Sequence, residues 1–429
     1  MGCLTFVVLI ITSICRCTCS SCSHPTTSPS HHLTTSPHIV HLNDTLSNAL
    51  SDQSELHAMD SIMRRYLKRW EINGAQLAIS RHDSLLYARG FGFSDLSRQQ
   101  PMEPSQIMRM ASVSKLVTAV GIMKLRDMGK VRLTDKVFGP QGILNDTFYV
   151  NSIRDKRHFD ITVEQLLRHK AGFTNYAGDP IFSTRYIMQQ NRLATPPDHR
   201  NLLRIVLGRR LGYTPGTMQR YCNIGYTLLS LIIEKRTGMS YEKFMQRYVL
   251  EPAGCFDFHI AGNYLKDRRP NETVYYMHSS SEPAQEFNNS GRLVERCYGE
   301  NDITTALGAG AWTASAAELC RLVAAIDGDP TMPDVISPEA VRLMTQEMPD
   351  HQFSLGWNYT PNGRPWIRTG SLVGTSAIVL RYPDGECWVF ITNTSTWKGH
   401  KFSKDTMALF EKLRKRFGSK LPKRNLFVK

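Results

Sequence analysis

The sequence predicts a mixed α/β (α+β) fold, in which an antiparallel sheet flanked by helices is built from both ends of the chain. Two observations predict it. Strand-like runs occur early, at residues 74–81 and 85–93, and return only late, at 377–382 and 386–393. The region between them, about residues 133–296, is helical and loop-rich in pattern, so we expect an inserted all-helical subdomain.

The first residues differ in composition from the rest of the chain. Residues 4–14 form a nearly continuous apolar run that is too short to cross a bilayer as a helix but fits the hydrophobic region of a secretory signal. The residues up to Cys22 resemble a bacterial lipoprotein signal. We therefore expect residues 1–22 to be a signal peptide, followed either by membrane anchoring through a lipid at Cys22 or by simple secretion. The implied location is a bacterial periplasm or outer membrane.

Residues 23–54 are rich in Ser, Thr, Pro and His and predict a flexible tether. The remaining residues, 55–429, predict a single large domain. It begins with a helix at about 55–70, where apolar residues recur at helical spacing. His82-Asp83-Ser84 then joins the first two strands as a tight hairpin.

The helix that carries Ser112 is expected to run to about Met128 and to lie in the core, because its apolar residues occupy nearly every face. The late strands are joined by Pro383-Asp384-Gly385, whose residues favour a hairpin turn. A last helix is predicted at about 403–416. The late strands are expected to join the early strands in one sheet, and the last helix is expected to flank that sheet.

Composition excludes several functional classes. The net charge is +14, but the basic residues are dispersed except in the tail from Lys412, which indicates a solvated face and no nucleic-acid partner. Outside the leader the cysteines have no metal-ligand or redox spacing and are expected to be buried thiols. The sequence has no phosphate-loop or dinucleotide-binding motif, so we expect no cofactor and no metal.

Ser112 and Lys115 form a Ser-x-x-Lys motif on the predicted buried helix. Residues three apart on a helix are neighbours, and a serine hydroxyl becomes a useful nucleophile when a base lies within hydrogen-bond distance. Taken alone, the pair could equally be a helix N-cap beside a surface lysine. Other motifs decide between these interpretations.

Two further motifs follow in order. Tyr221-Cys222-Asn223 comes after the turn Pro215-Gly216-Thr217, and Arg368-Thr369-Gly370-Ser371 opens the late strand region. With the Ser-x-x-Lys motif, they resemble the serine beta-lactamase and penicillin-binding-protein superfamily, in the branch of class C beta-lactamases, D-alanyl-D-alanine carboxypeptidases and related esterases. The resemblance covers roughly residues 59–416.

The resemblance implies that Ser112 attacks a carbonyl carbon to form an acyl-enzyme, while Lys115 and Tyr221 transfer the proton. Neither lysine nor tyrosine is a good base at neutral pH unless its pKa falls. We therefore expect neighbouring cations to lower both pKa values, with Lys115 and Arg368 acting on Tyr221. His169, in an apolar helical context, is expected to be structural.

The resemblance also implies the substrate-binding residues. Asn223 would hold Lys115 and bond the substrate, and the amides of Ser112 and Ser371 would form the oxyanion hole. The substrate would bind along the strand that carries Arg368, Thr369, Gly370 and Ser371.

Arg368 stands where this superfamily usually has lysine or histidine. Its fork would either grip a substrate carboxylate or block the pocket. The expected function is an exported serine hydrolase that cleaves an amide or ester bond in a small-molecule or peptide substrate. A D-Ala-D-Ala carboxypeptidase or other peptidase, or an esterase, is favoured over a dedicated beta-lactamase. The alternative is a catalytically silent penicillin-binding-like protein that binds peptidoglycan or peptides.

Overall fold

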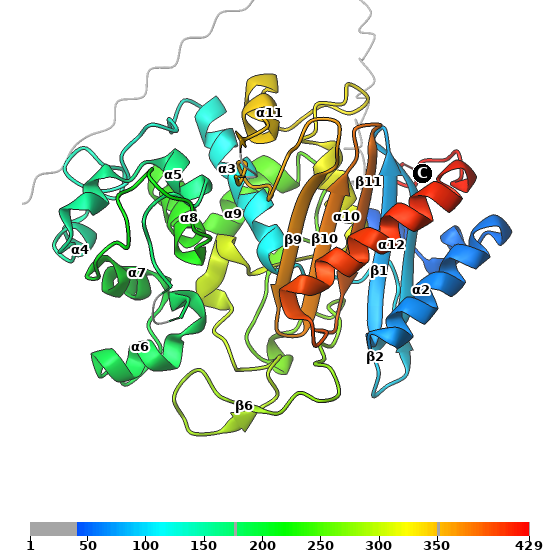
Figure 1. Cartoon of the computed structure of the whole chain (residues 1–429), viewed down its shortest axis with the longest axis horizontal. Helices are drawn as coiled ribbons and strands as arrows, with labels where there is room; N and C mark the ends of the chain where they lie inside the picture. Colours follow the sequence, from blue (N-terminus) through cyan, green and yellow to red (C-terminus); the bar gives the residue numbers. More distant parts are fainter. Residues whose placement is uncertain (1–40, 176–177, 350–351, 429) are drawn as a thin grey trace, which may run out of the picture. The chain divides into compact units, whose positions relative to one another are not determined.

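The computed structural model describes residues 41–175, 178–349 and 352–428. Its largest sheet has six antiparallel strands in the order β3-β2-β1-β11-β10-β9 (Figure 1). β1 pairs with β11, with Ala78 opposite Val389. The predicted sheet built from both chain ends is therefore confirmed. The strands are β1 (Gly74–Arg81), β2 (Ser84–Asp95), β3 (Gln100–Pro101), β9 (Trp366–Leu372), β10 (Thr375–Arg381) and β11 (Glu386–Thr392).

The turn between β1 and β2 confirms the first predicted hairpin. His82 and Asp83 both have positive φ, of 44° and 58°. A two-residue turn with positive φ at both positions has the twist that suits a tight hairpin. The strands pair up to Arg81 and Ser84 beside the turn, with one register shift between Ile79 and Ser80.

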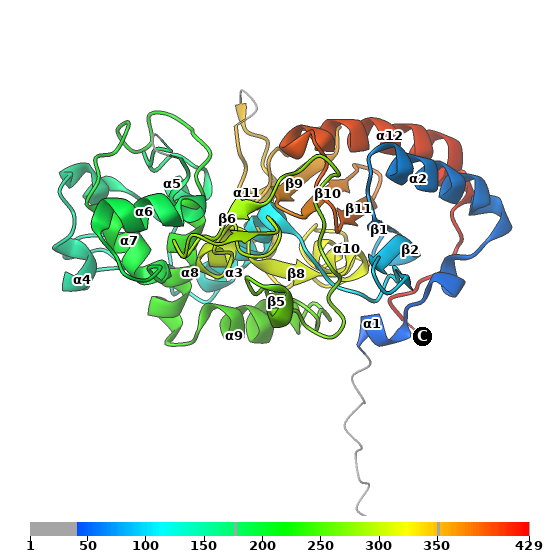
Figure 2. The same ribbon diagram turned by 90° about the horizontal axis from the view of Figure 1, so that it is seen from below.

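Two helices cover one face of the sheet, α2 (His57–Arg69) and α12 (Phe402–Phe417) (Figure 2). Their apolar stripes are buried against the sheet, as with Met63 of α2 and Phe410 of α12. Phe410 lies on Trp388 and Phe390 of β11, at centroid distances of 5.2 and 5.9 Å. Removing this apolar surface from water stabilises the pairing of the two chain ends.

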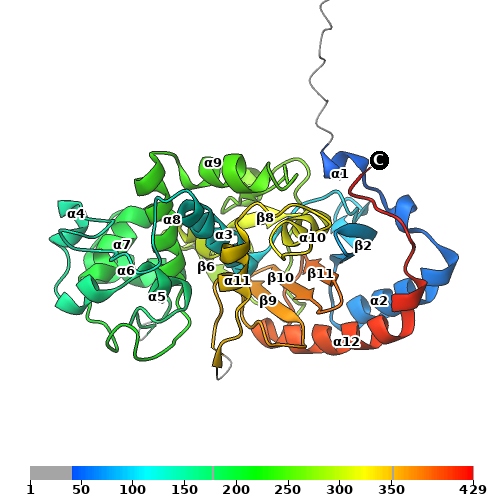
Figure 3. The ribbon, with the colours of Figure 1, turned by 90° about the horizontal axis from the view of Figure 1, so that it is seen from above.

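The other face is covered by α10 (Ala316–Ala324) (Figure 3). Ser315 caps the N-terminus of this helix by accepting a hydrogen bond from the Glu318 amide. A small antiparallel sheet, in the order β4-β8-β5, lies nearby. Its strands are β4 (Met108–Arg109), β5 (His259–Ile260) and β8 (Trp312–Ala314).

The predicted central helix is α3 (Ser114–Asp127), which lies between the sheet and the helical region (Figure 1). All its residues from Ser114 to Met123 are buried, as the apolar pattern predicted. The other helices are α4 (Thr147–Val150), α5 (Val163–Leu167), α6 (Thr184–Asn191), α7 (His199–Leu207), α8 (Asn223–Thr237), α9 (Tyr241–Met245) and α11 (Pro338–Thr345). Within the described ranges, no helix is both long and apolar enough to cross a membrane.

The region 133–296 is not wholly helical. It contains the strand β5 and a two-stranded ribbon of β6 (Ala284–Gln285) and β7 (Leu293–Val294). Each has two residues, too few to show the alternation by which a strand is recognised in sequence.

The tether prediction is wrong over its last part. Residues 42–45 form the short helix α1 (Leu42–Thr45), and a 3-10 turn follows at Asn48–Ser51. The Asn43 amide donates to Asp257 Oδ2 at 2.7 Å, and Asn48 Nδ2 donates to the Met102 carbonyl at 2.7 Å. Such contacts depend on single polar side chains and leave no periodic signal. The predicted signal peptide, Cys22 and the first part of the tether lie outside the described residues.

Candidate active site

Ser112 lies in a 3-10 turn, η3 (Ala111–Val113), directly before α3. Ala111 has φ of 48°, a left-handed conformation that reverses the chain sharply as it leaves β4. Lys115 follows one turn later and is fully buried. Its Nζ donates to Ser112 Oγ at 3.2 Å, so the predicted pair is in contact.

Tyr221 and Asn223 reach the same point from the start of α8. Gly216, in the turn before them, has φ of 88° and allows the chain to turn back toward α5. The Tyr221 hydroxyl donates to Ser112 Oγ at 2.6 Å, and Asn223 Oδ1 accepts from Lys115 Nζ at 2.6 Å. The serine oxygen therefore lies between two proton-carrying groups.

Asp179 belongs to this site and was not predicted from the sequence. Its Oδ2 accepts a hydrogen bond from Asn223 Nδ2 at 2.7 Å, while its Oδ1 accepts from the Ile181 amide at 3.0 Å. The carboxylate thereby fixes the Asn223 amide with its oxygen toward Lys115. In sequence, Asp179-Pro180 is an ordinary cap for a 3-10 turn, and no motif distinguishes it.

Arg368 is fully buried and binds the backbone of the nucleophile. Its Nε donates to the Ser112 carbonyl oxygen at 2.8 Å, and its Nη2 donates to the same oxygen. Nε and Nη2 of the fork are thus engaged by the protein itself, and whether Arg368 binds a substrate carboxylate or blocks the pocket stays a prediction. Nη1 has no hydrogen-bond partner within the described ranges.

The strand β9 places Thr369, Gly370 and Ser371 beside the Ser112 turn. A Cβ at Gly370 would lie 2.4 Å from the Met110 carbonyl oxygen and 2.9 Å from the Ser112 amide nitrogen. Only glycine allows this close approach. The strand and the turn therefore meet backbone to backbone.

β9 is an edge strand, and alternate residues direct their N–H groups away from β10. Thr369 N donates outward to Asn358 Oδ1 at 3.0 Å, so the Ser371 amide, two residues on, points the same way. Two amides, of Ser112 and Ser371, thus flank the close contact at Gly370. That these two amides form an oxyanion hole stays a prediction.

The two groups that contact Ser112 Oγ differ in their titration. Burial lowers the pKa of Lys115 well below its usual range, and the Arg368 charge lowers it further. Burial raises the pKa of Tyr221, and the opposing effect of Arg368 is smaller. The expectation that both pKa values fall is correct for Lys115 and wrong for Tyr221, because removal from water disfavours the phenolate. Lys115 is the better base at neutral pH.

His169 lies behind Tyr221 and does not reach Ser112. Its Nδ1 accepts from the Cys222 amide at 3.3 Å, and its ring packs 4.6 Å from Tyr221 and 4.9 Å from Phe353 between centroids. Burial lowers the pKa of His169 well below its usual value, so the ring is neutral. These contacts support the structural role predicted for it.

In the ranges that the structure covers, no three His, Cys, Asp or Glu side chains are grouped so that they could hold a metal ion.

An antiparallel sheet flanked by helices, with a Ser-x-x-Lys turn against its edge strand, defines the serine beta-lactamase and penicillin-binding-protein superfamily. The comparison with family models agrees. The chain belongs to the Beta-lactamase family, whose model matches residues 59–411.

Among curated proteins, the chain is similar to Penicillin-binding protein 4* of Bacillus subtilis, with 25% identity over 353 residues, 77% of this chain and 70% of that protein. Among solved structures, it is similar to a D-amino acid amidase from Ochrobactrum anthropi in complex with D-phenylalanine, with a TM-score of 0.64, 18% identity and coverage of 85% of this chain and 99% of that chain. It is also similar to the D-alanine carboxypeptidase AmpC from Burkholderia cenocepacia, with a TM-score of 0.62, 17% identity and coverage of 84% and 100%. At these identities, the structural comparisons show the fold.

Proposed function

We propose that this protein is a serine hydrolase that cleaves an amide or ester bond through an acyl-Ser112 intermediate. The observation that carries the proposal is the double contact on Ser112 Oγ, with Lys115 Nζ at 3.2 Å and the Tyr221 hydroxyl at 2.6 Å. A hydroxyl held between a base of lowered pKa and a second proton carrier is an activated nucleophile.

In the proposed acylation, neutral Lys115 accepts the Ser112 proton as Oγ attacks the substrate carbonyl carbon. The carbonyl π electrons move onto the oxygen, and the Ser112 and Ser371 amides stabilise that charge. Tyr221 donates its proton to the leaving nitrogen or oxygen as the bond from that atom to carbon breaks, and Lys115 passes the proton taken from Ser112 to Tyr221. Water then attacks the ester carbonyl carbon while Lys115 accepts a proton from it, and as the bond from carbon to Ser112 Oγ breaks, Lys115 returns that proton to Oγ and the acid is released.

The substrate class is proposed from the relatives together with the site. The named relatives are a penicillin-binding protein, a D-amino acid amidase and a D-alanine carboxypeptidase. The last two names support a small peptide or amino-acid amide of D configuration over a dedicated beta-lactam substrate, and a simple ester is included because it would acylate Ser112 by the same attack. The outward amides of Ile367 and Thr369 are already bonded within the chain, so the Ser371 N–H is the group of β9 that we expect to bond an extended peptide laid along the strand edge.

A labelling experiment and a hydrolysis panel test the proposal. The purified chain is incubated with a fluorophosphonate or a labelled penicillin, and the modified residue is mapped by mass spectrometry. Nitrocefin, p-nitrophenyl esters and D-Ala-D-Ala peptides are then assayed with Ser112→Ala as control. We expect an adduct on Ser112 and turnover that this variant abolishes; a chain that no probe labels, with equal rates in the variant, would refute the proposal.

A second candidate is a binding protein that acylates slowly or not at all and holds peptidoglycan or peptide ligands. Arg368 favours it, because its guanidinium is fixed on the Ser112 carbonyl at the position where the superfamily usually has lysine or histidine. Ready turnover of esters or D-Ala-D-Ala peptides would exclude this candidate.

We also propose that the chain is exported through residues 1–22 and anchored by a lipid on Cys22. The support is the apolar leader and its cysteine-rich end. Expression in a bacterium, followed by fractionation and mass spectrometry of the N-terminus, tests it. Cys22→Ala should release the protein from the membrane fraction, and an unprocessed cytoplasmic chain would contradict the export proposal.

A further inference from the structure

The basic residues are concentrated in one part of the chain. Residues 151–220 contain twelve Lys and Arg but only five Asp and Glu, so they carry +7 of the chain's net charge of +14. Several of these arginines have acidic partners: Arg157 binds Asp155 at 2.6 Å and Arg168 binds Glu164 at 2.8 Å. Other arginines of this region have no acidic partner among the described residues, and three of them, Arg154, Arg204 and Arg209, lie together.

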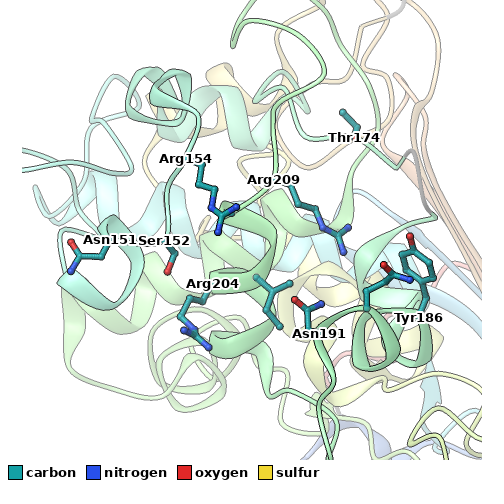
Figure 4. A pocket seen from close by; sticks show the side chains of 11 residues that line it. Asn151, Ser152, Arg154, Thr174, Tyr186, Asn191, Arg204 and Arg209 are labelled. Atoms are coloured by element: carbon teal, nitrogen blue, oxygen red, sulfur yellow. The ribbon is translucent and has the colours of Figure 1, made fainter.

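The unpaired arginines surround an open cavity of about 600 Å³ in the helical region. Figure 4 shows the guanidinium groups of Arg154 and Arg209 over this cavity, with Arg204 on α7 beneath them in this view and Tyr186 on α6 at its right. We call it the arginine cavity. Its lining residues are Asn151, Ser152, Arg154, Thr174, Tyr186, Gln190, Asn191, Arg204, Ile205, Gly208 and Arg209.

No lining residue carries a negative charge. Arg154, Arg204 and Arg209 form no ion pair with any residue in the described ranges. Arg204 lies 5.4 Å from the Phe148 ring, a contact that leaves its charge uncompensated. Three like charges around one cavity repel each other, and a bound anion of high charge would remove that repulsion.

The other groups in the arginine cavity indicate the kind of anion. The planar arginine fork matches phosphate oxygens, and the amides of Asn151, Gln190 and Asn191 add neutral donors. Tyr186 is 42% exposed, which leaves an aromatic ring free for the body of a ligand. A cavity of this volume accommodates a molecule of small-cofactor size. We propose that the arginine cavity binds a small phosphorylated molecule through Arg154, Arg204 and Arg209.

The arginine cavity is separate from the Ser112 site but shares a loop with it. Thr174 lines the cavity, and the next residue, Asn175, donates from Nδ2 to the Tyr221 carbonyl oxygen at 3.4 Å. The catalytic residues themselves do not line the cavity. The proposal therefore does not depend on hydrolysis at Ser112.

Calorimetric titration of the full chain with pyrophosphate at 50 mM salt tests the proposal. We expect saturable binding of one equivalent, weakened at least about tenfold in Arg154→Ala and Arg209→Ala, because each variant loses a charged hydrogen-bonding group. Arg210→Ala is the matched control: it removes the same charge from a neighbouring exposed residue that does not line the cavity, and it should bind as the wild type does.

Two further arms make the result specific. Ser112→Ala should bind pyrophosphate unchanged, which separates this site from the catalytic proposal. Citrate, a carboxylate anion of high charge, should bind more weakly than pyrophosphate. Absence of binding, equal weakening in Arg210→Ala, or equal affinity for citrate would each overturn the proposal.

Discussion

Replacing Gly370 with alanine should separate the amides of Ser112 and Ser371, which we expect to form the oxyanion hole. The new Cβ would lie 2.4 Å from the Met110 carbonyl oxygen and 2.9 Å from the Ser112 amide nitrogen. Non-bonded heavy atoms rest at about 3.5 Å, so β9 and the Ser112 turn must move apart by roughly 1 Å. A donor–acceptor distance of about 2.9 Å would then approach 4 Å, which is no longer a hydrogen bond. Loss of one donor reduces kcat by about 100- to 1,000-fold.

The assay is acylation by a p-nitrophenyl ester, followed by stopped flow, together with a thermal melt that checks folding. Gly208→Ala is the control, because a Cβ there meets nothing closer than 3.4 Å. We expect the control to acylate as the wild type does. If Gly370→Ala melts cooperatively and acylates within about threefold of the wild type, the assignment of the two amides is wrong.

Four other substitutions give independent tests. Tyr221→Phe removes the hydroxyl on Ser112 Oγ and should slow acylation at least about 100-fold; a near-wild-type rate would assign all proton transfer to Lys115. Arg368→Gln removes a cation that lowers the pKa of Lys115, so the acid limb of the pH–acylation profile should move to higher pH, and an unmoved limb would refute this coupling. Asp179→Asn removes an anion that raises the pKa of Lys115, so the acid limb of the pH–acylation profile should move to lower pH. The acylation rate should also fall about tenfold, because the Asn223 side-chain amide loses the carboxylate that holds it. A shift of the acid limb to higher pH would contradict the reasoning. Burial raises the pKa of Glu318 to about 8 from an ordinary value of 4.5, so the folded state binds the carboxyl proton more tightly than the unfolded state does. The free energy of unfolding should therefore fall as the pH rises from about 5 to 8. In thermal melts, Glu318→Gln should show a weaker dependence of the melting temperature on pH than the wild type, and parallel curves for the two proteins would count against this reasoning.

Much of the sheet could be predicted from the sequence, because its strands alternate or are continuously apolar between clear turns. The prediction for residues 74–81 coincides with β1, and the predicted late strands lie within two residues of β10 and β11. β9 was indicated only by its motif, because Thr369, Gly370 and Ser371 give an edge strand little apolar character. The helices α10 and α11 were missed, although Ser315 and Ser337 are ordinary N-caps.

The candidate site was predictable where its residues lie in short motifs. Ser112 and Lys115 are one helical turn apart, and Tyr221 and Asn223 are two residues apart, so local geometry and order along the chain identify them. Asp179 could not be found in this way, because its partner is 44 residues away and its own surroundings suggest a cap. Arg368 was correctly expected to lie beside the other site residues as a cation, but its contact with the Ser112 carbonyl was not foreseen, since no sequence pattern marks a backbone oxygen as a partner.

The pairing of β1 with β11 also bears on the stage of folding at which the Ser112 turn and β9 come together. Ser112 is synthesised early, whereas the strand that supplies Ser371 begins at Trp366, so the growing chain carries the serine long before a complete oxyanion hole can exist. Contacts between residues so distant in sequence form slowly, because a long loop must close first. Under the proposed function, acylation should therefore appear during refolding only when the whole sheet has closed. The onset of acylation would then mark the pairing of the N-terminal and C-terminal strands.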